Sequence, residues 1–170
     1  MGREEGCYKC VASGEDVKNV EINFRFMPVE RSAGIIFFRN TPRGRVYLVI
    51  RSSNHIPERG EFWDFPKGRL EKGETGIQAA EREAVEEVDI KKYELQPDFK
   101  ETVKYFTRRS GRMKFVAMFL AEAKGAKVKL SWEHDAYEWL SYEKAYKRIS
   151  LKPMKEALKK ANDHLQTKSS

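Results

Sequence analysis

The stretch from Gly68 to Glu87 constrains the fold of this chain more than any other part of the sequence. It reads G-x5-E-x7-R-E-x-x-E-E, a spacing that would arise by chance on the order of once in ten thousand such sequences. Its second half has helical periodicity, since small and apolar residues recur along one stripe between residues 75 and 88. Thr75, followed three residues later by Gln78, forms a capping-box signature. We therefore expect a helix over residues 75–88.

Three carboxylates crowd one face of this expected helix. Glu83, Glu86 and Glu87 are three and four residues apart, so their side chains share a face and repel one another. The face is either a solvated acidic surface or a site that binds a cation. Mg²⁺ takes oxygen ligands and is commonly shared between protein carboxylates and substrate phosphates. Composition alone favours the solvated surface, so the choice depends on the fixed residues that precede the glutamates.

The remaining sequence predicts one domain of strands and helices behind a short arm. A chain of 170 residues, 40% of them hydrophobic, can bury a single good core. Residues 1–20 lack periodicity and are expected to form a flexible arm, and residues 21–167 one catalytic domain. Strands are expected at 21–26, 33–39, 45–51, 99–106, 114–122, 128–130 and 137–140, with a hairpin turn at 41–44. Helices are expected at 142–148 and 153–165.

The charge balance and the cysteines indicate which kinds of ligand and which cellular location to expect. The net charge of +7 favours polyanions such as nucleotides or nucleic acid, although solvated surface lysines explain much of it, so a nucleic-acid partner is not favoured. No apolar stretch approaches the roughly 20 residues that a membrane span needs, and residues 1–15 do not resemble a signal peptide. We expect a cytoplasmic protein.

Cys7 and Cys10 form a lone C-x-x-C without a second ligand pair, which favours reduced thiols over a zinc site.

The spacing from Gly68 to Glu87 resembles the Nudix box. This resemblance implies a Nudix α/β/α sandwich with a mixed sheet, in which a strand-loop-helix-loop unit presents the glutamates to Mg²⁺, with Mn²⁺ as an alternative. By the same resemblance the metal ligands are Glu83, Glu86 and Glu87, together with the Gly68 carbonyl, and Arg82 holds the unit together with the glutamate at position 74. The sequence departs from the family pattern at Ala84, where a large aliphatic is usual, and at Asp89, where glycine is usual.

Two stretches outside the box resemble the asymmetric diadenosine tetraphosphate hydrolases. Residues 63–68 read WDFPKG and residues 130–140 read LSWEHDAYEWL. The resemblance implies that Lys67 contacts a substrate phosphate and that Glu133 adds a carboxylate to the metal site or orients water. Glu87 or Glu133 is then the candidate base.

The same resemblance suggests further substrate contacts. Lys114 matches a family lysine near the phosphate chain, and Tyr105 or Phe106 matches an aromatic near an adenine ring. The diadenosine group tends to carry an aromatic residue where this chain has Leu151, which would stack on the second base. Leucine there predicts relaxed preference for a dinucleotide.

The implied reaction is hydrolysis of a phosphoanhydride bond, with diadenosine tetraphosphate yielding ATP and AMP. Three enzymatic alternatives share the box: a diphosphoinositol polyphosphate phosphohydrolase, an RNA 5′-end pyrophosphohydrolase and a hydrolase of oxidised nucleotides. A Nudix-fold module that binds nucleotides without cleaving them is a fourth. The complete set of glutamates argues against that module, and the sequence leaves the oligomeric state open.

Overall fold

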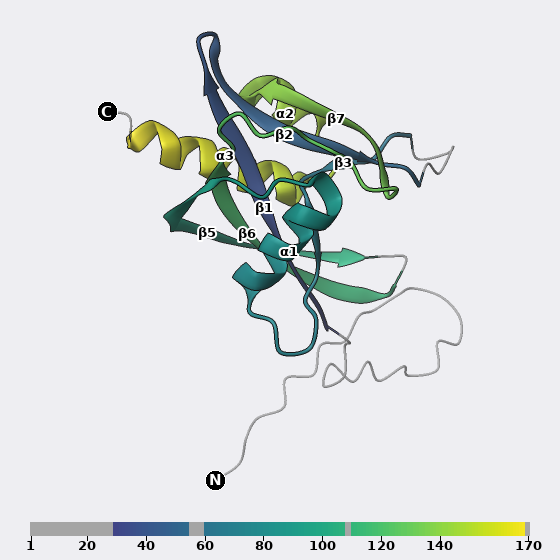
Figure 1. Ribbon diagram of the computed structural model, residues 1–170. Helices are drawn as coiled ribbons and strands as arrows, with labels where there is room; N and C mark the ends of the chain where they lie inside the picture. The colour runs from purple at the N-terminus through teal and green to yellow at the C-terminus, as the bar shows by residue number, and fades with distance from the viewer. Residues whose placement is uncertain (1–28, 55–59, 108–109, 169–170) are drawn as a thin grey trace, which may run out of the picture.

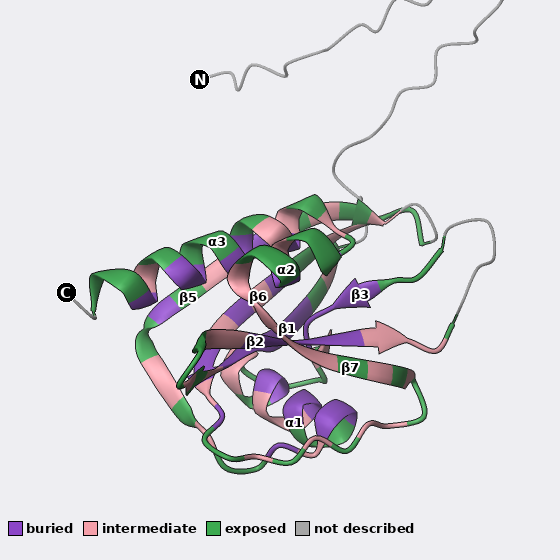
Figure 2. Cartoon of the chain, turned by 90° about the horizontal axis from the view of Figure 1, so that it is seen from above, coloured by how far each residue is buried: buried purple, intermediate pink, exposed green. Residues whose placement is uncertain are grey.

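A computed structural model describes residues 29–54, 60–107 and 110–168. Within these residues the chain forms a mixed seven-stranded sheet with the main strand order β3-β2-β1-β6-β5, in which β4 also pairs with β1 and β7 with β2. Helix α1 covers one face of the sheet, and α2 and α3 cover the other (Figures 1 and 2). The predicted α/β/α sandwich is confirmed. Among the residues that the structure describes, no helix is long and apolar enough to span a bilayer.

The centre of the sheet is a long hairpin of β1 (Val29–Thr41) and β2 (Gly44–Ser52). The two strands pair antiparallel up to Thr41 and Gly44, and the positive φ of 110° at Gly44 suits a glycine in the turn. The hairpin predicted from the sequence is therefore confirmed. The predicted strand at 21–26, the arm at 1–20 and both cysteines lie outside the described residues.

Strand β1 is buried on both faces, which is why its sequence is a continuous apolar run and does not alternate with polar residues. Ile35 and Phe37 pack on the α1 side, whereas Ile36 and Phe38 pack on the α3 side. Strand β6 (Arg112–Glu122) runs parallel to β1 along its whole length, and β5 (Glu94–Thr107) pairs antiparallel with β6 at the edge of the sheet. Two core clusters result, one on each face (Figure 2).

Helix α1 (Gly76–Val88) begins and ends as the sequence predicts. The Thr75 side chain and the Gln78 side chain cap each other's backbone in a complete capping box. Asp89 ends the helix in the left-handed conformation, with φ 53°, which Asp tolerates better than most side chains. Ala84 is buried against the sheet, so its small size permits a close approach of the helix.

The remaining elements are the short strands β3 (Trp63–Asp64) and β4 (Lys67–Arg69), then β7 (His134–Ser141), α2 (Tyr142–Arg148) and α3 (Lys152–Thr167). They confirm the strand predicted at 137–140 and both C-terminal helices. The prediction of a strand at 128–130 was wrong. This segment runs along the end of α1 instead, where Lys129 N donates to the Val88 carbonyl at 3.1 Å and the following Ser131 N donates to the Glu87 carbonyl at 3.0 Å.

Candidate active site

Strand β4 brings the backbone of Gly68 directly against the carboxylates of α1. Pairing of β4 with β1 sets Gly68 opposite Ala33, and a Cβ atom placed on Gly68 would overlap the carboxylate of Glu83. A larger residue at position 68 would have to displace the Glu83 carboxylate from its place beside Arg82. The box therefore needs glycine at this position because the strand and the helix meet there.

Arg82 ties the loop and the helix together, as the resemblance implied. Its guanidinium donates to both carboxylate oxygens of Glu74, at 2.8 and 3.0 Å, and to the Arg69 carbonyl at 2.8 Å. It also donates to Glu83 at 2.8 Å and to Glu86 at 2.9 Å. These bonds lower the pKa of Glu74 to about 2 and raise that of Arg82. One planar cation thus spans the strand, the loop and the helix.

The three helix glutamates differ in exposure. Glu83 and Glu87 are only 9% and 8% exposed, whereas the Glu86 side chain is 55% exposed. Burial raises the pKa of Glu83, and burial together with the nearby carboxylates of Glu83 and Glu133 raises the pKa of Glu87 to about 8, against the lowering effect of Lys67. Two carboxylates are therefore held in a place where their negative charge is costly.

This environment fits a divalent cation. Glu83 and Glu87 present buried carboxylate oxygens next to Gly68, which has no Cβ atom, and a bound cation would offset the cost of ionising them. The described residues contain no group of three or more His, Cys, Asp or Glu side chains arranged to hold a metal by themselves. Mg²⁺ is usually bound by one or two carboxylates, with waters and substrate phosphates completing its shell. The carboxylate pair meets that requirement.

Lys67 lies inside the site, in contact with a carboxylate that the sequence analysis did not single out. Its Nζ is 3.0 Å from Asp64 Oδ2, and its backbone N donates to Glu87 Oε2 at 2.7 Å. Burial alone would lower the pKa of Lys67, but Asp64 and Glu87 outweigh burial and raise it. Lys67 is thus a fixed cation next to Glu87. The sequence does offer one indication of a role for Asp64, which is its position within the WDFPKG stretch.

The turn that carries Glu133 closes the other side of the cluster. Glu133 precedes His134, whose Nε2 lies 3.8 Å from Glu87 Oε1. Burial, with a contribution from Lys67, lowers the pKa of His134 to about 4, so its imidazole is neutral at pH 7. His134 has no role predicted from the sequence, although it lies within the LSWEHDAYEWL motif.

Two of the expected substrate residues face each other across β5 and β6. Tyr105 pairs with Lys114 in the strand register, and Tyr105 also packs against the core cluster on the α3 side. Lys114 Nζ is 2.9 Å from Glu30, an acidic partner that the sequence analysis missed. Phe106 is 52% exposed and, as the next residue in the strand, points to the opposite face. Of the two aromatic candidates, Tyr105 is the one near Lys67.

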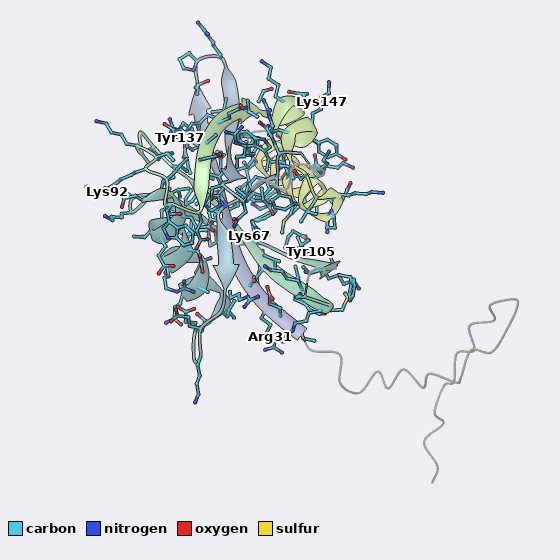
Figure 3. The ribbon with its side chains drawn as sticks, turned by 90° about the vertical axis from the view of Figure 1, so that its right-hand side faces the viewer. Arg31, Lys67, Lys92, Tyr105, Tyr137 and Lys147 are labelled. Carbon is cyan, nitrogen blue, oxygen red and sulfur yellow. The ribbon has the colours of Figure 1, made fainter. Side chains whose placement is uncertain are left out.

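Leu151 lies at the N-terminus of α3 and packs against the same core cluster as Tyr105. Both residues therefore lie on the α3 face of the sheet. The labelled side chains in Figure 3 show Lys67 near the centre of the molecule, between Tyr105 and Tyr137.

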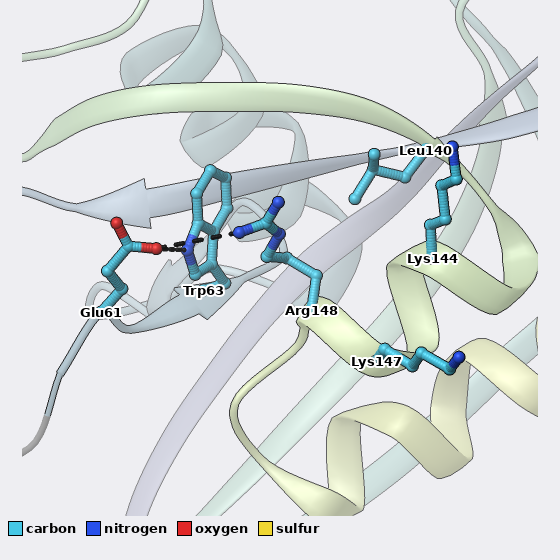
Figure 4. Close-up of a pocket in the computed structure, with 6 residues that line it drawn as sticks. All are labelled: Glu61, Trp63, Leu140, Lys144, Lys147 and Arg148. Atoms are coloured by element: carbon cyan, nitrogen blue, oxygen red, sulfur yellow. Dashed lines mark hydrogen bonds and ion pairs between the residues drawn. The ribbon is translucent and has the colours of Figure 1, made fainter.

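Two surface hollows lie apart from the carboxylates of α1. One, of about 470 Å³, is lined by Glu61, Trp63, Leu140, Lys144, Lys147 and Arg148 (Figure 4). Arg148 lies over the Trp63 ring at 4.9 Å and is 3.8 Å from Glu61. The other, of about 510 Å³, is lined by residues of β1, β5 and β6 and by Leu70 and Gly76. None of the predicted site residues lines either hollow.

The chain is similar in sequence and in structure to several known proteins. Residues 28–165 match the model of the NUDIX domain. The asymmetrical bis(5′-nucleosyl)-tetraphosphatase of Sus scrofa is 32% identical over 145 residues, which cover 79% of this chain and 95% of that protein. The crystal structure of a C. elegans Ap4A hydrolase binary complex superposes with a TM-score of 0.74 at 30% identity, covering 81% of this chain and 98% of that one. An RNA pyrophosphohydrolase of Bartonella bacilliformis is 31% identical over 77 residues, 44% of each chain.

Proposed function

This chain belongs to the NUDIX family of hydrolases, and we propose that it hydrolyses diadenosine tetraphosphate to ATP and AMP. One observation carries the choice of substrate. The similarity to the asymmetrical tetraphosphatases extends over nearly the whole length of those relatives, whereas the similarity to RNA pyrophosphohydrolases covers less than half of this chain. The match therefore extends beyond the box, over the regions to which we assign substrate binding.

We assign metal binding to Glu83, Glu86 and Glu87 and to the Gly68 carbonyl, with Glu133 beside them. Mg²⁺, or Mn²⁺ in its place, would neutralise negative charge on the phosphates and would lower the pKa of the attacking water. Arg82 keeps the glutamates in register through its bonds to strand, loop and helix. Its role is positioning.

The proposed reaction is in-line attack of water on one phosphorus atom of the tetraphosphate bridge. The new bond joins the water oxygen to phosphorus, and the bond from that phosphorus to the bridging oxygen breaks. A proton of the water passes to Glu87 or Glu133, whose charges are coupled so that the pair shares the role of base. Without a cation, burial raises the pKa of Glu87 to about 8, and a bound cation would favour the ionised carboxylate, which is the form that can accept a proton.

The substrate is held by the cations and aromatic residues around this cluster. Lys67, fixed against Asp64, is assigned to a phosphate oxygen, and Lys114 to the phosphate chain next to Tyr105. The sequence suggested that Leu151 faces the second base. Since Leu151 and Tyr105 pack against one core cluster, we instead assign both to a single base subsite.

A substrate panel tests the proposal. Purified protein is incubated in Mg²⁺ with diadenosine tetraphosphate, 5′-triphosphorylated RNA, a diphosphoinositol polyphosphate and an oxidised nucleoside triphosphate, and the products are identified. We expect equal amounts of ATP and AMP from the first substrate, at a rate that scales with protein and stops on chelation. Faster turnover of any other substrate would replace the assignment. Tight nucleotide binding without turnover would establish a binding module.

A further inference from the structure

The turn that joins the carboxylate cluster to β7 is fixed at both ends. Ser131 N donates to the Glu87 carbonyl at 3.0 Å, and His134 N closes the turn on the Ser131 carbonyl at 3.2 Å. On the other side, Ser53 N donates to the Glu133 carbonyl at 2.8 Å, and Ser53 Oγ to the Trp132 carbonyl at 3.1 Å. The backbone of residues 131–134 is therefore held between the end of α1 and the end of β2.

This fixed turn presents a large aromatic side chain to solvent. Trp132 is 83% exposed, whereas Trp63 is 3% exposed and Trp139 is covered by the Arg39 guanidinium at 3.5 Å. Leaving an indole in water forgoes the stabilisation that its burial would give. A rigid backbone that holds it there is an arrangement suited to stacking, because little conformational entropy is lost when a planar ligand binds.

The residues on either side of Trp132 tie the turn to the element that carries the carboxylate cluster. Ser131 N bonds to the main-chain carbonyl of Glu87 at the end of α1, and the Glu133 carboxylate is near enough to Glu83 and Glu87 for its charge to contribute to raising the pKa of both. Trp132 therefore lies at the border of the site where the phosphoanhydride would be cleaved.

Trp132 and Tyr105 flank this cluster from opposite sides. Tyr105 belongs to β5 at one edge of the sheet, while Trp132 precedes β7, which pairs with β2 on the far side of β1 and β6. In Figure 3, Tyr137 of β7 and Tyr105 likewise lie on opposite sides of Lys67. A phosphate chain that crosses the cluster would have one aromatic side chain near each end.

We propose that Trp132 is a second base-binding platform, whose indole stacks on the nucleobase at the end of the phosphate chain remote from Tyr105. The inference rests on the proposed function and adds to it a residue that distinguishes substrates with two bases from substrates with one. The ring at Trp132 supplies the second stacking surface that Leu151, a leucine on the Tyr105 side, does not.

The test compares two substrates on three proteins. KM is measured for diadenosine tetraphosphate and for adenosine 5′-tetraphosphate, which has a base at one end only, with wild type, Trp132→Leu and Trp132→Phe. Leucine preserves an apolar side chain without a ring, and phenylalanine restores a stacking face. We expect Trp132→Leu to raise KM for the dinucleotide about tenfold and to change KM for the single-base substrate less than twofold, with Trp132→Phe close to wild type. Equal changes for both substrates, or none, would overturn the proposal.

A binding measurement separates this proposal from the proposed activity. Diadenosine tetraphosphate is titrated in Mg²⁺ into Glu87→Gln protein and into the double variant that also carries Trp132→Phe, while tryptophan fluorescence is followed. Stacking predicts quenching in the first protein that is largely absent in the second, even if wild type hydrolyses neither substrate. Identical quenching in both refutes the platform. Quenching that follows protein concentration without ligand would assign the indole to a contact between copies of the chain, which also refutes it.

Discussion

Replacing Glu87 with glutamine is expected to abolish most activity and yet to stabilise the metal-free protein. The amide keeps the size of the side chain and an oxygen that can accept the bond from Lys67 N, now 2.7 Å long. It removes a negative charge that is buried next to Glu83 and Glu133. We expect kcat to fall more than tenfold, because a proposed metal ligand and candidate base is lost.

The effect on stability follows from the raised pKa. Glu87 titrates at about 8 in the folded protein, against 4.5 as the ordinary value. Between these two values the folded state keeps the proton that the unfolded state has released, so the stability of wild type falls as pH rises through this window. At about 1.4 kcal/mol for each tenfold change in proton affinity, the loss reaches at most about 5 kcal/mol at pH 8. The glutamine variant does not ionise and avoids this loss.

The assay is urea unfolding of both proteins in chelator between pH 4.5 and 8.5. The free energy of unfolding of Glu87→Gln minus that of wild type should be near zero at the acid end and should grow steadily to about 2–5 kcal/mol. Excess Mg²⁺ should reduce the difference, since it stabilises the ionised wild type. Glu86→Gln, on the same helix but exposed, is the control and should change stability by less than about 0.5 kcal/mol. A pH-independent difference between Glu87→Gln and wild type would refute the burial argument.

Three further substitutions test the surroundings of the cluster. Gly68→Ala should lower kcat at least tenfold and destabilise the fold by about 1–3 kcal/mol, because the Cβ atom of the alanine overlaps the Glu83 carboxylate. The control in the same urea assay is Gly76→Ala, because the nearest atom to its added Cβ would be 3.6 Å away. Arg82→Lys should lower both Tm and kcat, because one ammonium cannot reach all the acceptors of the guanidinium, and an unchanged Tm in thermal unfolding would contradict this. Leu151→Phe should lower KM for diadenosine tetraphosphate and for adenosine 5′-tetraphosphate by similar factors, and a change confined to the dinucleotide would show that position 151 faces the second base.

The sequence by itself determined the features that depend on near neighbours. The helix at 75–88, its capping box and the left-handed end at Asp89 follow from residues within four positions of one another. The hairpin of β1 and β2 follows from two apolar runs around a turn that contains glycine. The resemblance of the box also implied the pairing of Arg82 with Glu74, which the structure shows at 2.8 Å, whereas the contact of Gly68 with Glu83 came only from the structure.

Tertiary structure alone decided which groups lose their solvent and which partners they meet. Residues 128–130 have strand-like composition, but the backbone acceptors within reach belong to the end of α1. Glu86 and Glu87 are adjacent in sequence, yet only Glu87 is enclosed by β4 and the turn before β7. Its pKa rises because desolvation depends on every element packed around a carboxylate. That environment, together with the exposure of Trp132, is set by contacts between segments far apart in the chain, which no local pattern records.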